Sequence, residues 1–212
     1  RCATGFAETS GHKSGQGNPL FVKICGLKTP QTVEAALSAG ADALGFVFSP
    51  SPRRIDPAQA RELCRDLPTE VIRVAVMRQP LAEEWDEVRS VFEPDWLQTD
   101  NADFDALKLG GCEPLRVFRT GVSSTGTEWP PRLLFESAHS GSGKKADWKV
   151  AARVAETTQM ILAGGLDSDN LVSAIRTVNP WGVDVSSGVE ISRGIKDPEK
   201  IREFVARARA TE

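Results

Sequence analysis

Two side chains, a thiol and a carboxyl, stand where short apolar runs of this sequence end. Cys25 closes the run "FVKIC" and Glu136 closes "LLFE". A cation beside a thiol can bring its pKa toward neutrality and make it a general base. Burial raises the pKa of a carboxyl and keeps it protonated, as a general acid requires. We therefore predict an acid–base pair suited to isomerisation. The alternatives are an apolar filler at Cys25 and a solvated carboxylate at Glu136.

Two small-residue loops could bind a phosphate. One begins at Gly164-Gly165 and leads into a helix that Asp167 is expected to cap, and the other is Ser186-Ser187-Gly188. Loops of this kind can direct several backbone N–H groups at one anion. Two tight turns whose glycines only permit unusual backbone angles are the alternative.

A third glycine-rich segment, "SGSGKKADW", follows Glu136. We predict that it forms a mobile lid, in which Gly143 helps to bind the phosphate and Lys144 adds positive charge. A flexible connection without a role in binding is the alternative.

Several charged or polar residues complete the set of candidates. The planar guanidinium of Arg53, in "SPSPRRI", would suit a substrate carboxylate, and Arg54 is a weaker candidate. A solvated basic turn is the alternative for both. Gln98 and Asp100 end the fourth apolar run, and Asp184 lies within the last one.

Apolar runs and helix signals alternate along the chain. The runs lack the polar alternation of half-exposed strands, as expected for parallel strands buried on both faces. Helices are expected to start at Thr29-Pro30, Asp56-Pro57 and Asp197-Pro198, each a capping side chain before a proline. The second helix is expected to carry an apolar face as far as Leu67. The units after the fourth and fifth runs read as short helices or irregular loops. The eight runs are residues 21–25, 43–48, 71–77, 96–98, 115–118, 133–135, 160–163 and 182–185.

Eight such units predict a single α/β domain, a (β/α)₈ TIM barrel, over residues 20–212. Sites in this fold lie at the carboxyl ends of the strands, where the candidates above are placed. An open doubly wound sheet is the structural rival. It would normally carry a G-x-G-x-x-G fingerprint after its first strand, where this chain has Cys25-Gly26-Leu27.

Composition narrows the classes of function. The chain has 212 residues and a net charge of −3, which provides no overall field for nucleic acid or an anionic membrane. Four scattered cysteines and two histidines predict no metal site and suit reduced thiols in a cytoplasmic protein. No apolar stretch is long enough to span a membrane. Residues 1–19 read as a disordered extension or a remnant of cloning.

Five segments together resemble the phosphoribosylanthranilate isomerase family of tryptophan biosynthesis: "VKICGL", "GADALGFVFSPSPRRI", "LLFESAHSGSGKKADW", "ILAGGL" and "GVDVSSGVE". The resemblance runs in order from residue 21 to the C-terminus. It implies an Amadori rearrangement of N-(5-phosphoribosyl)anthranilate to 1-(2-carboxyphenylamino)-1-deoxyribulose 5-phosphate, by a monomer or homodimer without cofactor or metal. By position it makes Cys25 the base at ribose C2 and Glu136 the acid at the ring oxygen. It also places Arg53 at the anthranilate carboxylate and Asp184 in the same pocket.

The chain departs from the family pattern in two places. Glu136 stands where the family usually has the shorter aspartate, and "LQTD" stands where it often has Gln-Leu-His-Gly, so that Asp100 occupies the position of a histidine-containing motif. Three rivals remain open. Indole-glycerol-phosphate synthase would need a catalytic lysine, for which Lys23 is a poorly placed substitute. The analogous histidine-pathway isomerase would need an aspartate at Cys25. A non-catalytic phosphosugar-binding module would need neither Cys25 nor Glu136.

Overall fold

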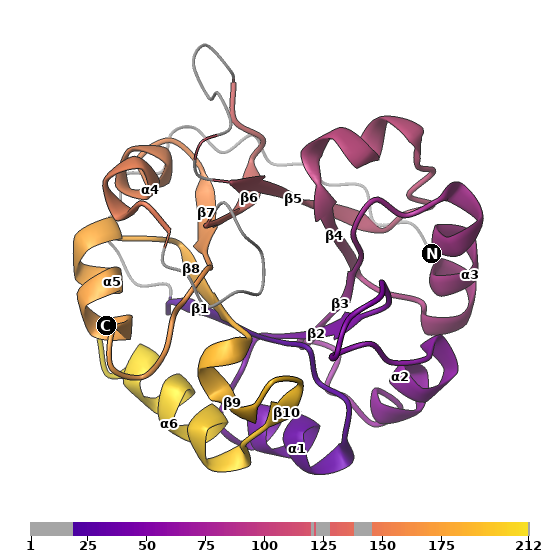
Figure 1. Cartoon of the computed structure of the whole chain (residues 1–212), viewed down its shortest axis with the longest axis horizontal. Coiled ribbons are helices and arrows are strands. Elements are labelled where there is room, and N and C mark those ends of the chain that lie inside the picture. Colours follow the sequence, from indigo (N-terminus) through magenta and orange to yellow (C-terminus); the bar gives the residue numbers. More distant parts are fainter. Residues whose placement is uncertain (1–18, 120, 122–127, 138–145, 212) are drawn as a thin grey trace.

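The computed structural model describes residues 19–119, 121, 128–137 and 146–211. The predictions for residues 1–18, for Gly143 and for Lys144 lie outside these residues. Eight parallel strands form a closed barrel in the order of the sequence (Figure 1), which confirms the predicted (β/α)₈ TIM barrel. The strands are β1 (Phe21–Cys25), β2 (Ala43–Val47), β3 (Ile72–Val76), β4 (Trp96–Asp100), β5 (Glu113–Arg119), β6 (Arg132–Glu136), β7 (Gln159–Leu162) and β8 (Gly182–Val185).

Helices surround the barrel, and they begin largely as predicted. The side chains of Thr29, Asp56 and Asp197 each accept a hydrogen bond from a backbone N–H in the first turn of the helix that follows. The connection between β4 and β5 is a short 3₁₀ helix, as the weak signal there predicted. The helices are α1 (Pro30–Ser38), α2 (Pro57–Leu63), α3 (Ala82–Phe92), η1 (Asn101–Ala106), α4 (Trp148–Ala155), α5 (Leu171–Val178) and α6 (Pro198–Arg209).

Two helix predictions were wrong in their limits. Helix α2 ends at Leu63, so Leu67 does not continue its apolar face. Asp167 does not cap α5 directly: Asn170 precedes that helix, and the Asp167 carboxylate accepts from the N–H groups of Asp169 and Asn170 in the turn before it. The sequence also gave no signal for the small antiparallel hairpin β9 (Glu190–Ser192) and β10 (Ile195–Lys196), nor for the 3₁₀ turn η2 (Ser187–Val189).

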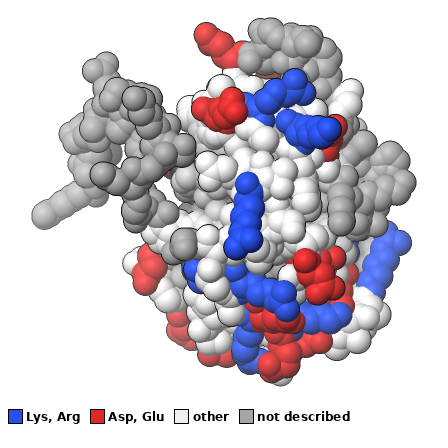
Figure 2. Space-filling view, turned by 90° about the vertical axis from the view of Figure 1, so that its left-hand side faces the viewer, with Lys and Arg blue, Asp and Glu red and all other residues white. Residues whose placement is uncertain are grey.

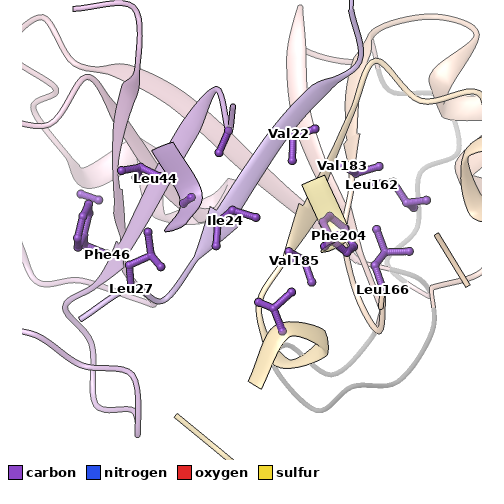
Figure 3. Packing of buried hydrophobic residues seen from close by; sticks show 14 of the residues in the cluster. Val22, Ile24, Leu27, Leu44, Phe46, Leu162, Leu166, Val183, Val185 and Phe204 are labelled. Atoms are coloured by element: carbon purple, nitrogen blue, oxygen red, sulfur yellow. The ribbon is translucent and has the colours of Figure 1, made fainter. Parts of the chain in front are cut away.

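Alternate residues of each strand face opposite sides of the sheet. One set, including Val22, Ile24 and Leu44, packs outward against the helices, as Figure 3 shows around Phe204 of α6. The other set packs inside the barrel, and its members include Phe21, Val74, Trp96, Leu115, Leu134 and Ile161. By the same alternation Lys23, Cys25, Gln98 and Glu136 belong to the inner set. The candidate side chains are therefore inward residues that lie beyond the apolar core, toward the carboxyl ends of the strands.

Candidate active site

The parallel barrel brings the predicted catalytic side chains to one rim. Cys25 is the last residue of β1 and Glu136 the last residue of β6. Asp100 and Arg119 end β4 and β5. Because all eight strands run in the same direction, these four ends open on the same side of the barrel. The sequence-based prediction that Cys25 and Glu136 belong to one site therefore agrees with the arrangement of the strands.

Cys25 lies beside a buried ion pair. Lys23, two residues earlier on β1, is fully buried, and its Nζ lies 2.6 Å from Oδ1 of Asp184 on β8. Strand β2 passes close to both side chains. A Cβ at Gly45 would lie 3.2 Å from Sγ of Cys25 and 3.3 Å from Cε of Lys23. Glycine at position 45 thus lets Lys23 and Cys25 occupy the same space at the rim.

The thiol of Cys25 does not have the near-neutral pKa that we expected. Cys25 is only 6% exposed, and burial raises the pKa of its thiol above the usual value. Lys23, Lys196 and Arg53 act in the opposite direction but do not offset the burial, and Asp184 adds to the rise. In the free protein the group is therefore mostly a thiol, and forming the thiolate depends on these cations.

Arg53 is held by a carboxylate of the protein itself. Its Nε and Nη2 donate to the two carboxylate oxygens of Glu190, at 2.7 and 2.9 Å. The stem of Arg53 crosses Gly26, where a Cβ would lie 2.8 Å from its Cδ and where φ is +81°. Part of the fork that we assigned to a substrate carboxylate is therefore engaged by Glu190, a partner on a distant strand that sequence patterns do not reveal.

Glu190 and Lys196 belong to the candidate site and were missed by the sequence analysis. Lys196 Nζ lies 2.8 Å from Oε1 of Glu190 and also donates to the backbone oxygen of Ser186. Burial opposes ionisation of Glu190, but hydrogen bonds from Arg53 and Lys196 prevail and lower its pKa to about 2. Glu190 is the last residue of "GVDVSSGVE", one of the segments that resemble the family. This segment is the signal in the sequence that could have identified Glu190. We call Cys25 with Lys23, Arg53, Lys196, Asp184 and Glu190 the Cys25 cluster.

The two predicted phosphate loops touch each other. A Cβ at Gly188 would overlap the carbonyl oxygen of Leu166, and a Cβ at Gly164 would lie 2.7 Å from the backbone nitrogen of Ser137, after β6. Gly164 and Gly165 have φ of +86° and +68°, backbone angles that favour glycine. The turn itself therefore also accounts for these two glycines. Within the described residues, the N–H groups of Gly165 and Gly188 donate to no other group. These N–H groups are therefore able to bind an anion.

The side chain of Ser186 has a structural role that the sequence analysis did not predict. Its hydroxyl donates to the backbone oxygen of Cys25 at 3.1 Å and accepts from Lys196 at 3.1 Å. The side chain thus fixes the loop after β8 to the end of β1. A hydroxyl engaged in both directions leaves the backbone of this loop as the part that can contact a phosphate.

Glu136 shares a guanidinium with Asp100. Arg119 Nε lies 3.0 Å from Oε1 of Glu136, and Arg119 Nη1 lies 2.5 Å from Oδ1 of Asp100. We call these three residues the Glu136 cluster. Arg119 thus links the two positions at which the chain departs from the family pattern, Glu136 and the Asp100 of "LQTD".

Gln98 offers a polar group to the inside of the barrel. It is 8% exposed, and its Oε1 has no hydrogen-bond partner among the described residues. A buried amide oxygen without a partner is costly, so a bound ligand that donates a hydrogen bond would stabilise it. Across the part of the chain that the structure describes, no group of three or more His, Cys, Asp and Glu side chains is arranged to hold a metal ion.

Comparison with known proteins identifies the family. The model of the N-(5'-phosphoribosyl)anthranilate (PRA) isomerase family matches residues 22–207. The chain belongs to this family. It is 39% identical over 193 residues to the N-(5'-phosphoribosyl)anthranilate isomerase of Streptococcus pneumoniae (strain Hungary19A-6), a match that covers 89% of this chain and 95% of that protein. The enzyme of the same name from Pelobacter propionicus is 37% identical over 209 residues, covering 91% of this chain and 97% of the relative.

Solved structures of phosphoribosyl anthranilate isomerases have the same fold. The one from Thermus thermophilus has a TM-score of 0.78 at 30% identity and covers 91% of this chain and 100% of that chain. Another, in complex with reduced 1-(o-carboxyphenylamino)-1-deoxyribulose 5-phosphate, has a TM-score of 0.73 at 29% identity, covering 90% and 99%. The predicted family and the predicted isomerase of tryptophan biosynthesis are thereby confirmed. None of the helices in the described ranges is long and apolar enough to cross a membrane.

Proposed function

We propose that this chain carries out the Amadori rearrangement of N-(5'-phosphoribosyl)anthranilate with Cys25 as general base and Glu136 as general acid. The observation that carries the proposal is the placement of these two side chains at the carboxyl ends of β1 and β6, on one rim of the barrel. The two touching loops after β7 and β8 lie on the same rim. An isomerase of this kind needs a proton donor, a proton acceptor and an anchor for the substrate phosphate.

In the proposed reaction, Glu136 donates a proton to the ribose ring oxygen while the bond between C1 and that oxygen breaks. The lone pair of the anthranilate nitrogen forms a double bond to C1 and leaves an iminium ion. The Cys25 thiolate then removes the proton from C2, and the electron pair of that C–H bond forms the enolamine. Tautomerisation of the enolamine gives the ketone product. Cys25 then loses its proton to solvent, and Glu136 regains a proton from solvent. No other reactant is required.

We propose that the ends of the substrate bind to different parts of the rim. The backbone N–H groups of Gly164, Gly165, Ser187 and Gly188, with that of Ser186, would bind the phosphate. The free N–H groups of Gly165 and Gly188 support this. Gly143 is proposed for the same role.

The anthranilate end is proposed to lie near Arg53, which can offer it Nη1, the guanidinium nitrogen that makes no bond to Glu190. Asp184 would orient the substrate indirectly, because its carboxylate is bonded to Lys23. Gln98 is proposed to accept a hydrogen bond from the substrate inside the barrel. Each of these roles follows from which atoms the protein itself leaves available.

The rival functions are less well supported. A synthase that relies on a mobile catalytic lysine would need Lys23 free, but Lys23 is fully buried against Asp184. A histidine-pathway isomerase would need a carboxylate where Cys25 stands. A non-catalytic phosphosugar-binding module would leave the convergence of Cys25 and Glu136 unexplained.

We also propose that the only partners required are the phosphorylated substrate and, at most, a second copy of the chain, in the cytoplasm. Net charge is −3, and acidic and basic side chains lie interspersed on the face shown in Figure 2, which disfavours nucleic acid. Monomer and homodimer are both consistent with the relatives, since the Thermotoga maritima enzyme is described as dimeric and has also been obtained as monomers.

The test of this proposal is a steady-state fluorescence assay with freshly prepared N-(5'-phosphoribosyl)anthranilate. The anthranilate group is fluorescent, so conversion changes the signal continuously with time. We expect turnover by the purified chain. A signal that changes only in proportion to the protein added, without turnover, would indicate a binding module and would contradict the proposal.

A further inference from the structure

Lys23 has no role in the mechanism above, although of the charged groups around Cys25 it has the largest effect on the pKa of the thiol. It follows the same inward alternation on β1 as Cys25, two residues away, and it is fully buried. Both side chains lie against Gly45 of β2, at the distances given above. Burying an ammonium group is costly unless it is paired, and Asp184 at 2.6 Å supplies the pair. The fold therefore places a buried cation beside the thiol of Cys25.

The other cations near Cys25 are tied to a different carboxylate. Arg53, from the loop after β2, donates two hydrogen bonds to Glu190, and Lys196 of β10 donates one to the same residue. Burial lowers the pKa of Lys196. Burial also acts to lower the pKa of Lys23, but Asp184 and Cys25 outweigh it, and the pKa of Lys23 is raised. Of the two lysines, Lys23 is thus the one held firmly as an ammonium ion.

The charges of the Cys25 cluster do not cancel. Facing Cys25 are Lys23 from β1, Asp184 from β8, Arg53 from the loop after β2 and Lys196 from β10, with Glu190 of β9 behind the last two. Among the described residues, three cations against two carboxylates leave one positive charge in a buried site. A thiolate on Cys25 would neutralise that charge. The cluster is therefore complementary to the deprotonated form of the base.

We propose that Lys23 is a positioning residue that stabilises the thiolate of Cys25, with Asp184 fixing the ammonium group of Lys23 beside the sulfur. The inference extends the proposed function, since it rests on Cys25 as the base. Lys23 acts on the substrate only through Cys25. Asp184 has two opposing effects on the thiolate: it holds the lysine in place, and its own negative charge disfavours a second anion nearby.

The test is a titration of Cys25 in the free protein by thiolate ultraviolet absorbance. The sequence contains no tyrosine, so no phenolate absorbs in the same region. Each variant is measured with and without an added Cys25→Ser change, and the difference isolates Cys25 from the other cysteines. Cys64 and Cys112 provide an internal check, because burial raises the pKa of each to about 12. Substrate is not needed, so the result is independent of turnover.

Two opposite shifts are expected. Lys23→Met removes the cation and should move the Cys25 midpoint upward by about one pH unit or more, which reduces the thiolate about tenfold at a given lower pH. Asp184→Asn removes the opposing carboxylate but keeps the lysine, and should move the midpoint downward by about one unit. Lys149→Met, on the exposed side of α4, is the matched control and should not move it. A merely structural role of Lys23 would not produce shifts of opposite sign.

The titration has two results that would overturn the proposal. An unchanged midpoint in folded Lys23→Met would overturn the proposal, as would an upward shift in Asp184→Asn. If Lys23→Met fails to fold because Asp184 is left buried without its partner, the double variant Lys23→Met/Asp184→Asn is compared with Asp184→Asn, and its Cys25 midpoint should lie higher than that of Asp184→Asn by about one unit. If neither lysine variant folds, the direction of the shift in Asp184→Asn decides. If Cys25→Ser alone keeps parental turnover, the proposed function fails, and the titration still reports on the Lys23–Cys25 pair.

Discussion

Among the residues that the structure describes, three cations and two carboxylates surround Cys25, whereas at Glu136 the guanidinium of Arg119 bridges the carboxylates of Glu136 and Asp100. The first arrangement, counted over these same residues, has one positive charge in excess, which stabilises a thiolate and acts against the burial that raises the pKa of Cys25. In the second, two carboxylates share one guanidinium at the ends of neighbouring strands. The proposed base and the proposed acid thus lie in different electrostatic surroundings.

The two clusters also differ in burial and in how their charges are held. Lys23 and Asp184 are separated from solvent inside the barrel, and burial is the dominant influence on the pKa of Cys25. Arg119 and Asp100 end strands at a more open part of the rim, where their side chains are 21% and 24% exposed. The proposed base therefore lies among fixed buried charges, whereas the proposed acid is bonded to a guanidinium that two carboxylates share.

The strongest way to break the comparison is to remove the base. Cys25→Ser should lower kcat by about 10² to 10⁴-fold, because a hydroxyl is far harder to deprotonate than a thiol even beside Lys23. Turnover is followed by anthranilate fluorescence. Cys64→Ser, which changes a cysteine remote from the rim, is the control and should retain parental kcat. Near-parental turnover by Cys25→Ser would show that another group removes the C2 proton.

The acid side is tested by changing Glu136 and Asp100 separately. Glu136→Gln keeps the shape of the side chain but cannot donate an acidic proton, so kcat should fall about 10²-fold. Glu136→Asp should keep substantial activity with a shorter reach. Asp100→Asn should have a smaller effect, since it only releases one partner of Arg119. A fully active Glu136→Gln with an inactive Asp100→Asn would move the acid to β4.

Arg53→Ala sharpens the comparison by separating stability from binding. The substitution leaves Glu190 buried with Lys196 alone, and breaking a buried ion pair costs about 3 kcal/mol of unfolding free energy. Denaturant unfolding measures this, and Arg54→Ala is the control expected to lie within about 0.5 kcal/mol of the parent. If Arg53 also binds the anthranilate carboxylate, KM should rise for the normal substrate and not for one without that carboxylate. Unchanged stability would contradict the structural role.

The proposed phosphate site is tested at Gly165, in the loop after β7. Gly165→Asp places a carboxylate beside the proposed phosphate and should raise KM about tenfold, with little change in kcat. Gly165→Asn is the matched control, since asparagine has the same shape and both residues tolerate a positive φ. The difference between the two variants measures charge alone. Equal KM values for both would place the phosphate elsewhere.

The smallest effect is a pH dependence of stability from Glu190. Its pKa is lowered to about 2 in the folded protein, so it binds fewer protons than in the unfolded chain. Its contribution is fully present above the ordinary glutamate pKa and is lost as pH falls from there toward 2. Unfolding free energy, compared between the parent and Glu190→Gln over this range, should show a shallower decline in the variant. Parallel pH profiles would show that the Cys25 cluster is not held by Glu190.

The fold and the location of the site could be read from the sequence because both depend on local patterns. Apolar runs, capping residues and prolines identified the strands and most helix starts, and the ends of the strands then identified Cys25 and Glu136. The partners of these residues could not be found in this way. Lys23 bonds to Asp184 across 161 positions, and Arg53 bonds to Glu190 across 137. Such pairings are set by the closure of the barrel, which no periodicity in the sequence records.

The most direct test of the acid–base account is kcat for Cys25→Ser, Glu136→Gln and the double variant, measured side by side by fluorescence. If the two side chains act as a unit on one substrate, the double variant should lose little more than the worse single variant, because each single change already blocks the same proton-transfer sequence. Losses that multiply in the double variant would show that Cys25 and Glu136 act independently. Parental kcat in either single variant would contradict the account outright.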